Sequence, residues 1–170
     1  MITGLVRRGG EPARGRRPVM IVCSSGGHLL QMLALRDAWE PYERVWVTFD
    51  KSDARSLLAD ERVLHAYGPT NRDIPNLLRN VRLAWRKLRA ERPSAILTTG
   101  AGVAVPFAWI GRILGIPTIY VESVTRIDEL SLSARLIAPV ATRLYAQWPQ
   151  LAEQPRRRAI RFAGNVLSDR

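Results

Sequence analysis

The sequence predicts an α/β fold of the Rossmann-like, doubly wound class, with a parallel sheet and helices on both faces. Short apolar runs rich in β-forming residues alternate with segments of helical periodicity, and this alternation is typical of such a sheet. The run at 19–23 contains no charged residue, as expected of a strand that is buried on both faces. Glycine-containing turns follow the first and the fourth predicted strands, at 24–27 and 100–102.

Each predicted element follows from its local pattern. The predicted strands are 19–23, 44–49, 62–67, 95–99, 118–121, 143–147 and 160–163. The predicted helices are 29–39, 52–59, 73–91, 103–114 and 130–137. In the helix at 73–91, apolar residues recur at three- and four-residue steps, so we expect this stripe to face the sheet. The stripe consists of Ile74, Leu77, Leu78, Val81, Trp85 and Leu88. Residues 1–17 are expected to form a flexible basic tail, and residues 18–170 a single domain.

The charge of the chain indicates a polyanionic partner. The net charge is +11, and its basic residues are arginines except for Lys51 and Lys87. Nucleic acid, an anionic membrane surface and phosphorylated substrates fit this charge, and a compositional bias toward arginine is the alternative. The single cysteine, Cys23, excludes an internal disulfide and is typical of a reducing compartment. We find no membrane-spanning run and no signal peptide, so we expect a cytoplasmic protein.

The two glycine turns are expected to meet at one edge of the sheet. In the common strand order 3-2-1-4-5, the first and fourth strands are neighbours at the topological switch point. Backbone N–H groups at a helix N-terminus attract anions, and glycine permits close approach. The turns therefore predict a site for a diphosphate or a phosphosugar, with His28 at its mouth and Glu122 at its border. Tight turns without a ligand are the alternative. The turn residues predicted to bind substrate are Ser25, Gly26, Gly27, Gly100, Ala101 and Gly102.

The helix at 73–91 combines an apolar stripe with arginines. A basic amphipathic helix with a tryptophan can lie in a membrane interface, and a helix packed on the sheet gives the same pattern. Both interpretations hold if Leu83 and Trp85 flank the buried stripe. The predicted membrane contacts are Leu83, Trp85, Arg82 and Arg86, together with Trp109 from the next helix.

An ordered set of motifs resembles a known family. Ser-Gly-Gly-His stands at 25–28, Gly-Ala-Gly at 100–102, and Tyr-Val-Glu-Ser at 120–123. The last block continues through Arg126 to Ser131 and Ser133, and Gln-Trp-Pro follows at 147–149. With these motifs the chain resembles the membrane-associated, acceptor-binding subunit of two-subunit glycosyltransferases. Members are the anchoring subunit of the dolichol-pathway N-acetylglucosaminyltransferase and bacterial PssD-type relatives in polysaccharide synthesis.

The resemblance implies one half of a two-chain enzyme. The chain would correspond to the N-terminal half of a GT-B glycosyltransferase such as MurG, and a separate small chain would bind the UDP-sugar. The expected acceptor is a polyprenyl-diphosphate-linked sugar, and the isolated chain is expected to have little or no transferase activity. The eukaryotic subunits carry an N-terminal membrane helix that this sequence lacks, which favours the bacterial branch. We therefore expect peripheral attachment to the cytoplasmic side of the membrane, through the helix at 73–91, the surface around Trp109 and the arginines.

The resemblance also suggests roles for individual residues. His28 is a candidate base for the attacking sugar hydroxyl, and binding of phosphate or capping of the helix are its alternatives. Glu122 is the second candidate base, and it could instead orient a hydroxyl or only pair with Arg126. Arg126 could hold the diphosphate by a bidentate contact, and Ser123 is assigned to substrate binding. No His/Cys cluster indicates a metal, and no cofactor is predicted.

Two other functions remain in competition. Asp50, after the second predicted strand, suits the ribose-binding acid of a free-standing dinucleotide-binding domain, but the first turn lacks Gly-x-Gly-x-x-Gly spacing. The basic charge suits a nucleic-acid-binding protein, but no RRM, KH or zinc-finger signature is present. The donor sugar, the acceptor sugar and the oligomeric state do not follow from the sequence.

Overall fold

A parallel sheet of seven strands organises the described residues, which are 17–70, 73–153 and 160–166 of the computed structural model. Its order is β3-β2-β1-β4-β5-β6-β7, and all neighbouring strands run parallel. This confirms the predicted doubly wound fold and its 3-2-1-4-5 order. Except for Arg17, the predicted tail at 1–17 lies outside the described residues. The strands are β1 (Val19–Val22), β2 (Arg44–Phe49), β3 (Val63–Ala66), β4 (Ala95–Thr98), β5 (Thr118–Val121), β6 (Arg143–Ala146) and β7 (Ile160–Phe162).

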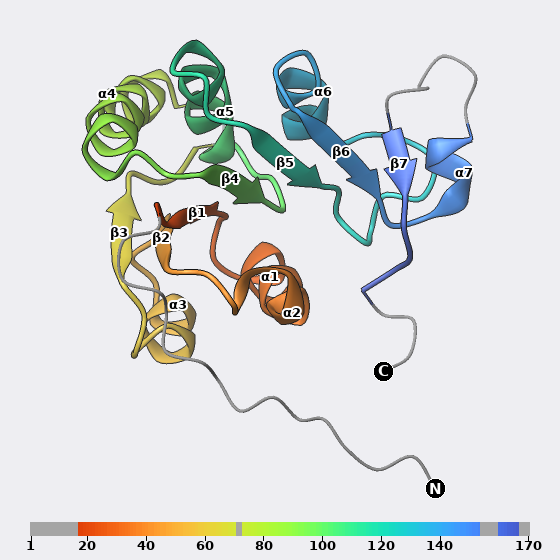
Figure 1. Cartoon of the computed structure of the whole chain (residues 1–170), viewed down its shortest axis with the longest axis horizontal. Coiled ribbons are helices and arrows are strands. Elements are labelled where there is room, and N and C mark those ends of the chain that lie inside the picture. Colours follow the sequence, from red (N-terminus) through yellow and green to blue (C-terminus); the bar gives the residue numbers. More distant parts are fainter. Residues whose placement is uncertain (1–16, 71–72, 154–159, 167–170) are drawn as a thin grey trace, which may run out of the picture.

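The helices form two layers, one on each face of the sheet (Figure 1). One layer contains α1 (Gly27–Ala34), α2 (Arg36–Trp39) and α3 (Ser52–Leu57). The other contains α4 (Ile74–Glu91), α5 (Ala104–Ile113) and α6 (Leu132–Ile137), while α7 (Pro149–Ala152) precedes β7. Right-handed crossovers produce this division, because the chain first moves from β1 toward β3 and then returns past β1 toward β7. The helix predicted at 29–39 is divided into α1 and α2 at Leu35.

The central strand β1 carries the core on both of its faces. Met20 and Val22 pack in the cluster under α4 and α5. Val19, Ile21 and Cys23 pack in the cluster under α1 and α3. All four residues of β1 are buried, which confirms the prediction from its uninterrupted apolar run. The carboxyl ends of the central strands are thereby held rigidly, and these ends carry the glycine turns.

The orientation of α4 differs from the predicted one. Its buried residues are Asn76, Asn80, Ala84 and Leu88. The other residues of the predicted stripe are exposed by 39% to 68%, and they are Ile74, Leu77, Leu78, Val81 and Trp85. Periodicity reveals which residues share a helix face, but not whether that face meets the sheet or solvent. In this fold the helix turns two amides inward because they bond to the chain before it. No helix among the described residues is both long and apolar enough to cross a bilayer.

Candidate functional site

The two glycine turns meet at the carboxyl edge of the sheet, as predicted. Strands β1 and β4 are neighbours, with Val22 beside Thr98. Two hydrogen bonds then join the turns that follow: Thr99 Oγ1 donates to the carbonyl of His28, and His28 Nδ1 lies 2.8 Å from the carbonyl oxygen of Thr99. Gly26 and Gly100 have φ angles of 75° and 104°, which L-residues rarely adopt, so glycine is required for these turns.

The contact with Thr99 determines the tautomer of His28. A carbonyl oxygen can only accept a hydrogen bond, so Nδ1 must carry the proton. In the neutral ring Nε2 then has a free lone pair, and no hydrogen-bond partner for it occurs among the described residues. The side chain is half-buried and lines two pockets. This is the arrangement that a general base needs, with one nitrogen oriented and the other open.

Some of the N–H groups predicted to bind a diphosphate already have partners. The Gly26 N–H donates to Asp53 Oδ2 at 2.6 Å, and the Gly100 N–H donates to Thr98 Oγ1 at 2.9 Å. The prediction that these two glycines offer free donors is therefore wrong for this conformation. Asp53 lies 27 residues further along the chain on α3, and no local sequence signal identifies such a contact.

Two adjoining pockets surround His28. The loop pocket has a volume of about 950 Å³ and lies between the first glycine turn, the end of β2 and the segment 66–70. The helix pocket has a volume of about 610 Å³ and lies between the starts of α4, α5 and α6. Both include His28, Thr70, Ala101 and Gly102. Of the other predicted substrate-binding residues, Ser25 lines the loop pocket, whereas exposed Arg126 lines the helix pocket.

Glu122 is a structural carboxylate, so its prediction as an alternative base is wrong. It has no exposed surface and lines neither pocket. Its Oε1 accepts from the Ser123 N–H at 2.7 Å, and its Oε2 accepts from the N–H and hydroxyl of Ser131 at 2.9 and 3.1 Å. These bonds, rather than a pair with Arg126, hold the segment between β5 and α6. Ser123 likewise lines neither pocket, and its hydroxyl lies 2.9 Å from that of Thr125.

A buried network continues from Glu122 to the second glycine turn. The Tyr120 hydroxyl lies 3.1 and 3.2 Å from the hydroxyls of Ser131 and Ser133, and it donates to Glu122 at 3.4 Å. Burial and the neighbouring Glu122 charge raise the pKa of Tyr120 to about 12. A Cβ on Gly100 would clash with the Tyr120 hydroxyl, so this turn packs directly on the network. The network thus supports the floor of the helix pocket.

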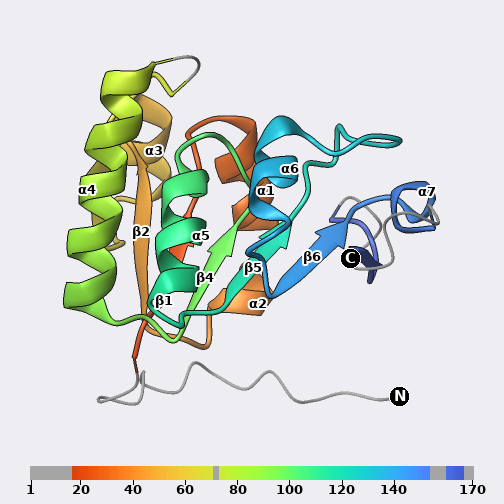
Figure 2. The same ribbon diagram turned by 90° about the horizontal axis from the view of Figure 1, so that it is seen from above.

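Helices α4, α5 and α6 lie side by side in the layer next to this pocket (Figure 2). They carry large apolar side chains that are exposed. Trp85, Arg82 and Arg86 lie on the exposed part of α4. Trp109 on α5 is 46% exposed, and its Nε1 donates to the Leu136 carbonyl of α6. Leu83 is partly buried and packs against the core, so it lies at the border between the core and the exposed side of α4. We call the exposed residues the apolar surface, which consists of Ile74, Leu77, Leu78, Val81, Trp85, Trp109, Ile113, Leu132 and Leu136.

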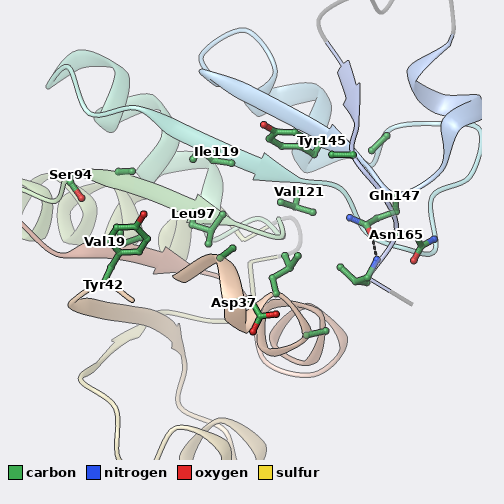
Figure 3. A pocket seen from close by; sticks show the side chains of 18 residues that line it. Val19, Asp37, Tyr42, Ser94, Leu97, Ile119, Val121, Tyr145, Gln147 and Asn165 are labelled. Carbon is green, nitrogen blue, oxygen red and sulfur yellow. Dashed lines mark hydrogen bonds between the residues drawn. The ribbon is translucent and has the colours of Figure 1, made fainter. Parts of the chain in front are cut away.

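The opposite face of the sheet carries an open groove of about 900 Å³ (Figure 3). Leu97 of β4, Ile119 and Val121 of β5 and Tyr145 of β6 form its floor, and α1 and α2 form one wall. The crossover helices α4 to α6 lie on the other face, so among the described residues only α1 and α2 border these strands on the groove side. Parallel sheets are normally covered on both faces. We call this feature the sheet groove, and it was not foreseen from the sequence.

Asp50, the acidic residue of the competing nucleotide-binding assignment, already has a partner in this structure. Asp50 forms a two-pronged ion pair with Arg55, at 2.5 and 2.8 Å. The hydrogen bonds from Arg55 engage both carboxylate oxygens and lower the pKa of Asp50, which is exposed and lines the loop pocket. Among residues 17–70, 73–153 and 160–166, no three His, Cys, Asp or Glu side chains gather as a candidate metal site.

Comparison with known proteins identifies the family. The family described as "Oligosaccharide biosynthesis protein Alg14 like" matches residues 71–165. A protein of Debaryomyces hansenii named "UDP-N-acetylglucosamine transferase subunit ALG14" is 32% identical, over 82% of this chain and 72% of its own. The chain belongs to the Alg14 family. A mouse protein of the same name is 27% identical, over 80% of this chain and 77% of its own. Membership of the Alg14 family confirms the resemblance in the motifs and makes the chain a glycosyltransferase subunit.

Solved structures confirm the expected fold. Acinetobacter baumannii MurG has a TM-score of 0.69 at 17% identity, and S. aureus MnaA, solved with UDP, has 0.67 at 14%. At these identities the likeness concerns the fold alone. The Alg14-family chain is covered to 87% in both comparisons, but it spans only 45% and 44% of those chains. It therefore corresponds in extent to less than half of either neighbour.

Proposed function

We propose that this chain is the acceptor-binding subunit of a two-chain glycosyltransferase. With a smaller donor-binding partner, it would transfer a sugar from a UDP-sugar to a polyprenyl-diphosphate-linked sugar, in polysaccharide or lipid-linked oligosaccharide synthesis. The observation that carries this proposal is the position of His28 between two pockets. The loop pocket has polar groups in its lining, such as Ser25 and Lys51, and the helix pocket opens toward the apolar surface. A lipid-linked, charged acceptor requires both surroundings side by side.

The residues around His28 can meet the needs of such an acceptor. Arg126, on the rim of the helix pocket, supplies positive charge for the diphosphate. Ala101 and Gly102 bring backbone of the second turn to both pockets. The open Nε2 of His28 takes the proton of the acceptor hydroxyl as this hydroxyl attacks the anomeric carbon and UDP leaves. The Thr99 carbonyl keeps Nε2 oriented during this step and stabilises the imidazolium that results.

The apolar surface supports peripheral attachment to a membrane. Its residues come from three neighbouring helices. Four of them, Ile74, Leu77, Leu132 and Leu136, line the helix pocket together, so they are not scattered single side chains. Arg82 and Arg86 lie exposed on the same helix as Trp85, where they can meet anionic headgroups. Because the helix pocket includes Ile74, Leu77 and Leu132 of this surface, the lipid of the acceptor can pass directly from the membrane to the site.

The sheet groove is our candidate for docking of the donor-binding partner. Its floor consists of apolar residues of three strands, of which Ile119 and Tyr145 are partly exposed. The chain also spans less than half of its structural neighbours. An apolar segment of the partner would cover the groove and thereby complete the second face of the sheet. Asp37 and Tyr42 at its rim are polar groups that can set the register of this segment (Figure 3).

A binding experiment with the isolated chain tests the acceptor assignment. We expect calorimetric titration with farnesyl diphosphate, a short prenyl diphosphate, to give saturable binding that Arg126→Gln weakens about tenfold. UDP-N-acetylglucosamine should give no binding at the same concentrations, because its site belongs to the partner. Binding of the nucleotide sugar without binding of the prenyl diphosphate would reverse the assignment. Random RNA and DNA, titrated at several salt concentrations, test the nucleic-acid alternative.

A further inference from the structure

We propose that Asn80, assisted by Asn76, is a positioning residue that holds one wall of the acceptor pocket in place. This inference rests on the proposed function and adds residues to which neither the motifs nor the comparisons assign a role. Both side chains lie on the buried side of α4, where they are 1% and 7% exposed. The wall is the segment 67–70, between β3 and α4.

Asn80 satisfies both backbone groups of a single residue in this wall. Its Oδ1 accepts from the Tyr67 N–H at 2.9 Å, and its Nδ2 donates to the Tyr67 carbonyl at 2.8 Å. The orientation of the amide is unambiguous, because an N–H can only donate and a carbonyl can only accept. The side chain thus makes the two backbone hydrogen bonds to Tyr67 that a neighbouring strand would make if β3 continued. Asn76 adds a bond from its Nδ2 to the Pro69 carbonyl at 3.1 Å.

The segment that the two amides hold contributes directly to the site. Tyr67, Gly68, Pro69 and Thr70 all line the loop pocket, as His28 does. Thr70 also lines the helix pocket. A Cβ on Gly102 would lie 2.9 Å from Thr70 Oγ1, so the segment packs closely against the second glycine turn. A shift of this segment therefore changes the width of the loop pocket and the approach to Gly102.

The composition of the buried side of α4 supports this role. A buried amide costs free energy unless both of its polar ends find partners. Alanine or leucine would pack against the sheet without this cost, as Ala84 and Leu88 do one and two turns further along. The amides stand only in the part of α4 that adjoins the segment 67–70. Their hydrogen bonds therefore point to anchoring of the backbone rather than to packing of the core.

Kinetics of the enzyme assembled with its partner test this inference. With UDP-N-acetylglucosamine and farnesyl-diphosphate-linked N-acetylglucosamine, we expect Asn80→Ala and Asn80→Leu each to raise the acceptor KM about tenfold. The kcat should stay within about twofold, because His28 keeps its bond to Thr99. Leucine restores volume but not the hydrogen bonds, so recovery of the normal KM in Asn80→Leu would overturn the inference. Thr142→Val is the matched control, because it removes one side-chain-to-backbone bond at the opposite edge of the sheet.

Amide hydrogen exchange supplies a readout that does not depend on catalysis. We expect the Tyr67 N–H to exchange at least about tenfold faster in Asn80→Leu, because its acceptor is gone. Exchange in β1 should not change, and equal acceleration in β1 would mean general destabilisation and overturn the inference. A wild-type enzyme without turnover on any polyprenyl-diphosphate sugar would refute the proposed function. A normal wild-type turnover with an unchanged acceptor KM in both Asn80 variants would refute this inference alone.

Discussion

Replacement of Glu122 by glutamine should weaken the fold and leave the chemistry intact. The two carboxylate oxygens receive two different backbone N–H groups, Ser123 at Oε1 and Ser131 at Oε2. Glutamine keeps the shape, but it has a single oxygen, so one of these N–H groups must face the Nε2 amide hydrogens. A buried donor without an acceptor costs about 1–3 kcal/mol. Each kcal/mol lowers the Tm of a domain of this size by about 2–4 °C.

Urea and thermal unfolding of Glu122→Gln and wild type measure this cost. Glu129→Gln is the matched control from the same segment, because Glu129 forms an exposed ion pair with Arg135 that contributes little to stability. We expect a clear loss of stability in Glu122→Gln, no loss in the control, and near-normal kcat of the assembled enzyme below the melting range. A Glu122→Gln protein as stable as wild type but without turnover would refute this reasoning and restore Glu122 as the base.

Four further predictions follow from the site, the two surfaces and the core. His28→Ala should lower kcat of the assembled enzyme about 10²–10⁴-fold at saturating acceptor, whereas a loss confined to KM would mean a phosphate ligand. Trp85→Ser should reduce flotation with anionic liposomes, and unchanged recovery would contradict the proposed membrane surface. Ala38→Glu in the sheet groove should abolish co-purification with the partner, whereas Ala90→Glu on α4 should not. Co-purification of the partner with both variants would exclude the groove as its docking site. Burial raises the pKa of Cys23 from 9.0 to about 12. The free energy of unfolding should therefore fall between these pH values, because only the unfolded thiol ionises there. Rapid labelling of Cys23 in the native protein at pH 8 by a thiol reagent would contradict this burial.

The sheet and the meeting of the two turns could be predicted because they depend on repeated, local signals. Apolar strands alternating with helices permit few topologies once crossovers are right-handed. The commonest of these strand orders, 3-2-1-4-5, places the turn at Gly26 beside the turn at Gly100, and the bonds between His28 and Thr99 confirm it. The family motifs then indicated the part of this edge where His28 lies.

The details that escaped prediction depend on contacts between distant residues. The rotation of α4 is decided by two amides that bond to the preceding loop, whereas periodicity alone favoured its apolar stripe as the buried side. Glu122 directly follows β5, where a carboxylate that lines a pocket is expected, but the segment up to Ser131 folds over it. Asp53 reaches Gly26 from a different helix. The sheet groove forms where α1 and α2 are the only described helices that border three strands, and no single residue signals this arrangement.

Turnover of the purified chain with and without its donor-binding partner tests the central claim most directly. The assay would combine UDP-N-acetylglucosamine with polyprenyl-diphosphate sugars and detect the elongated lipid by mass spectrometry. We predict that neither chain alone forms product and that the mixture does, with loss of product when His28 is replaced by alanine. Full turnover by the isolated chain, or none by the mixture with any acceptor of this class, would contradict the assignment of this chain as the acceptor half.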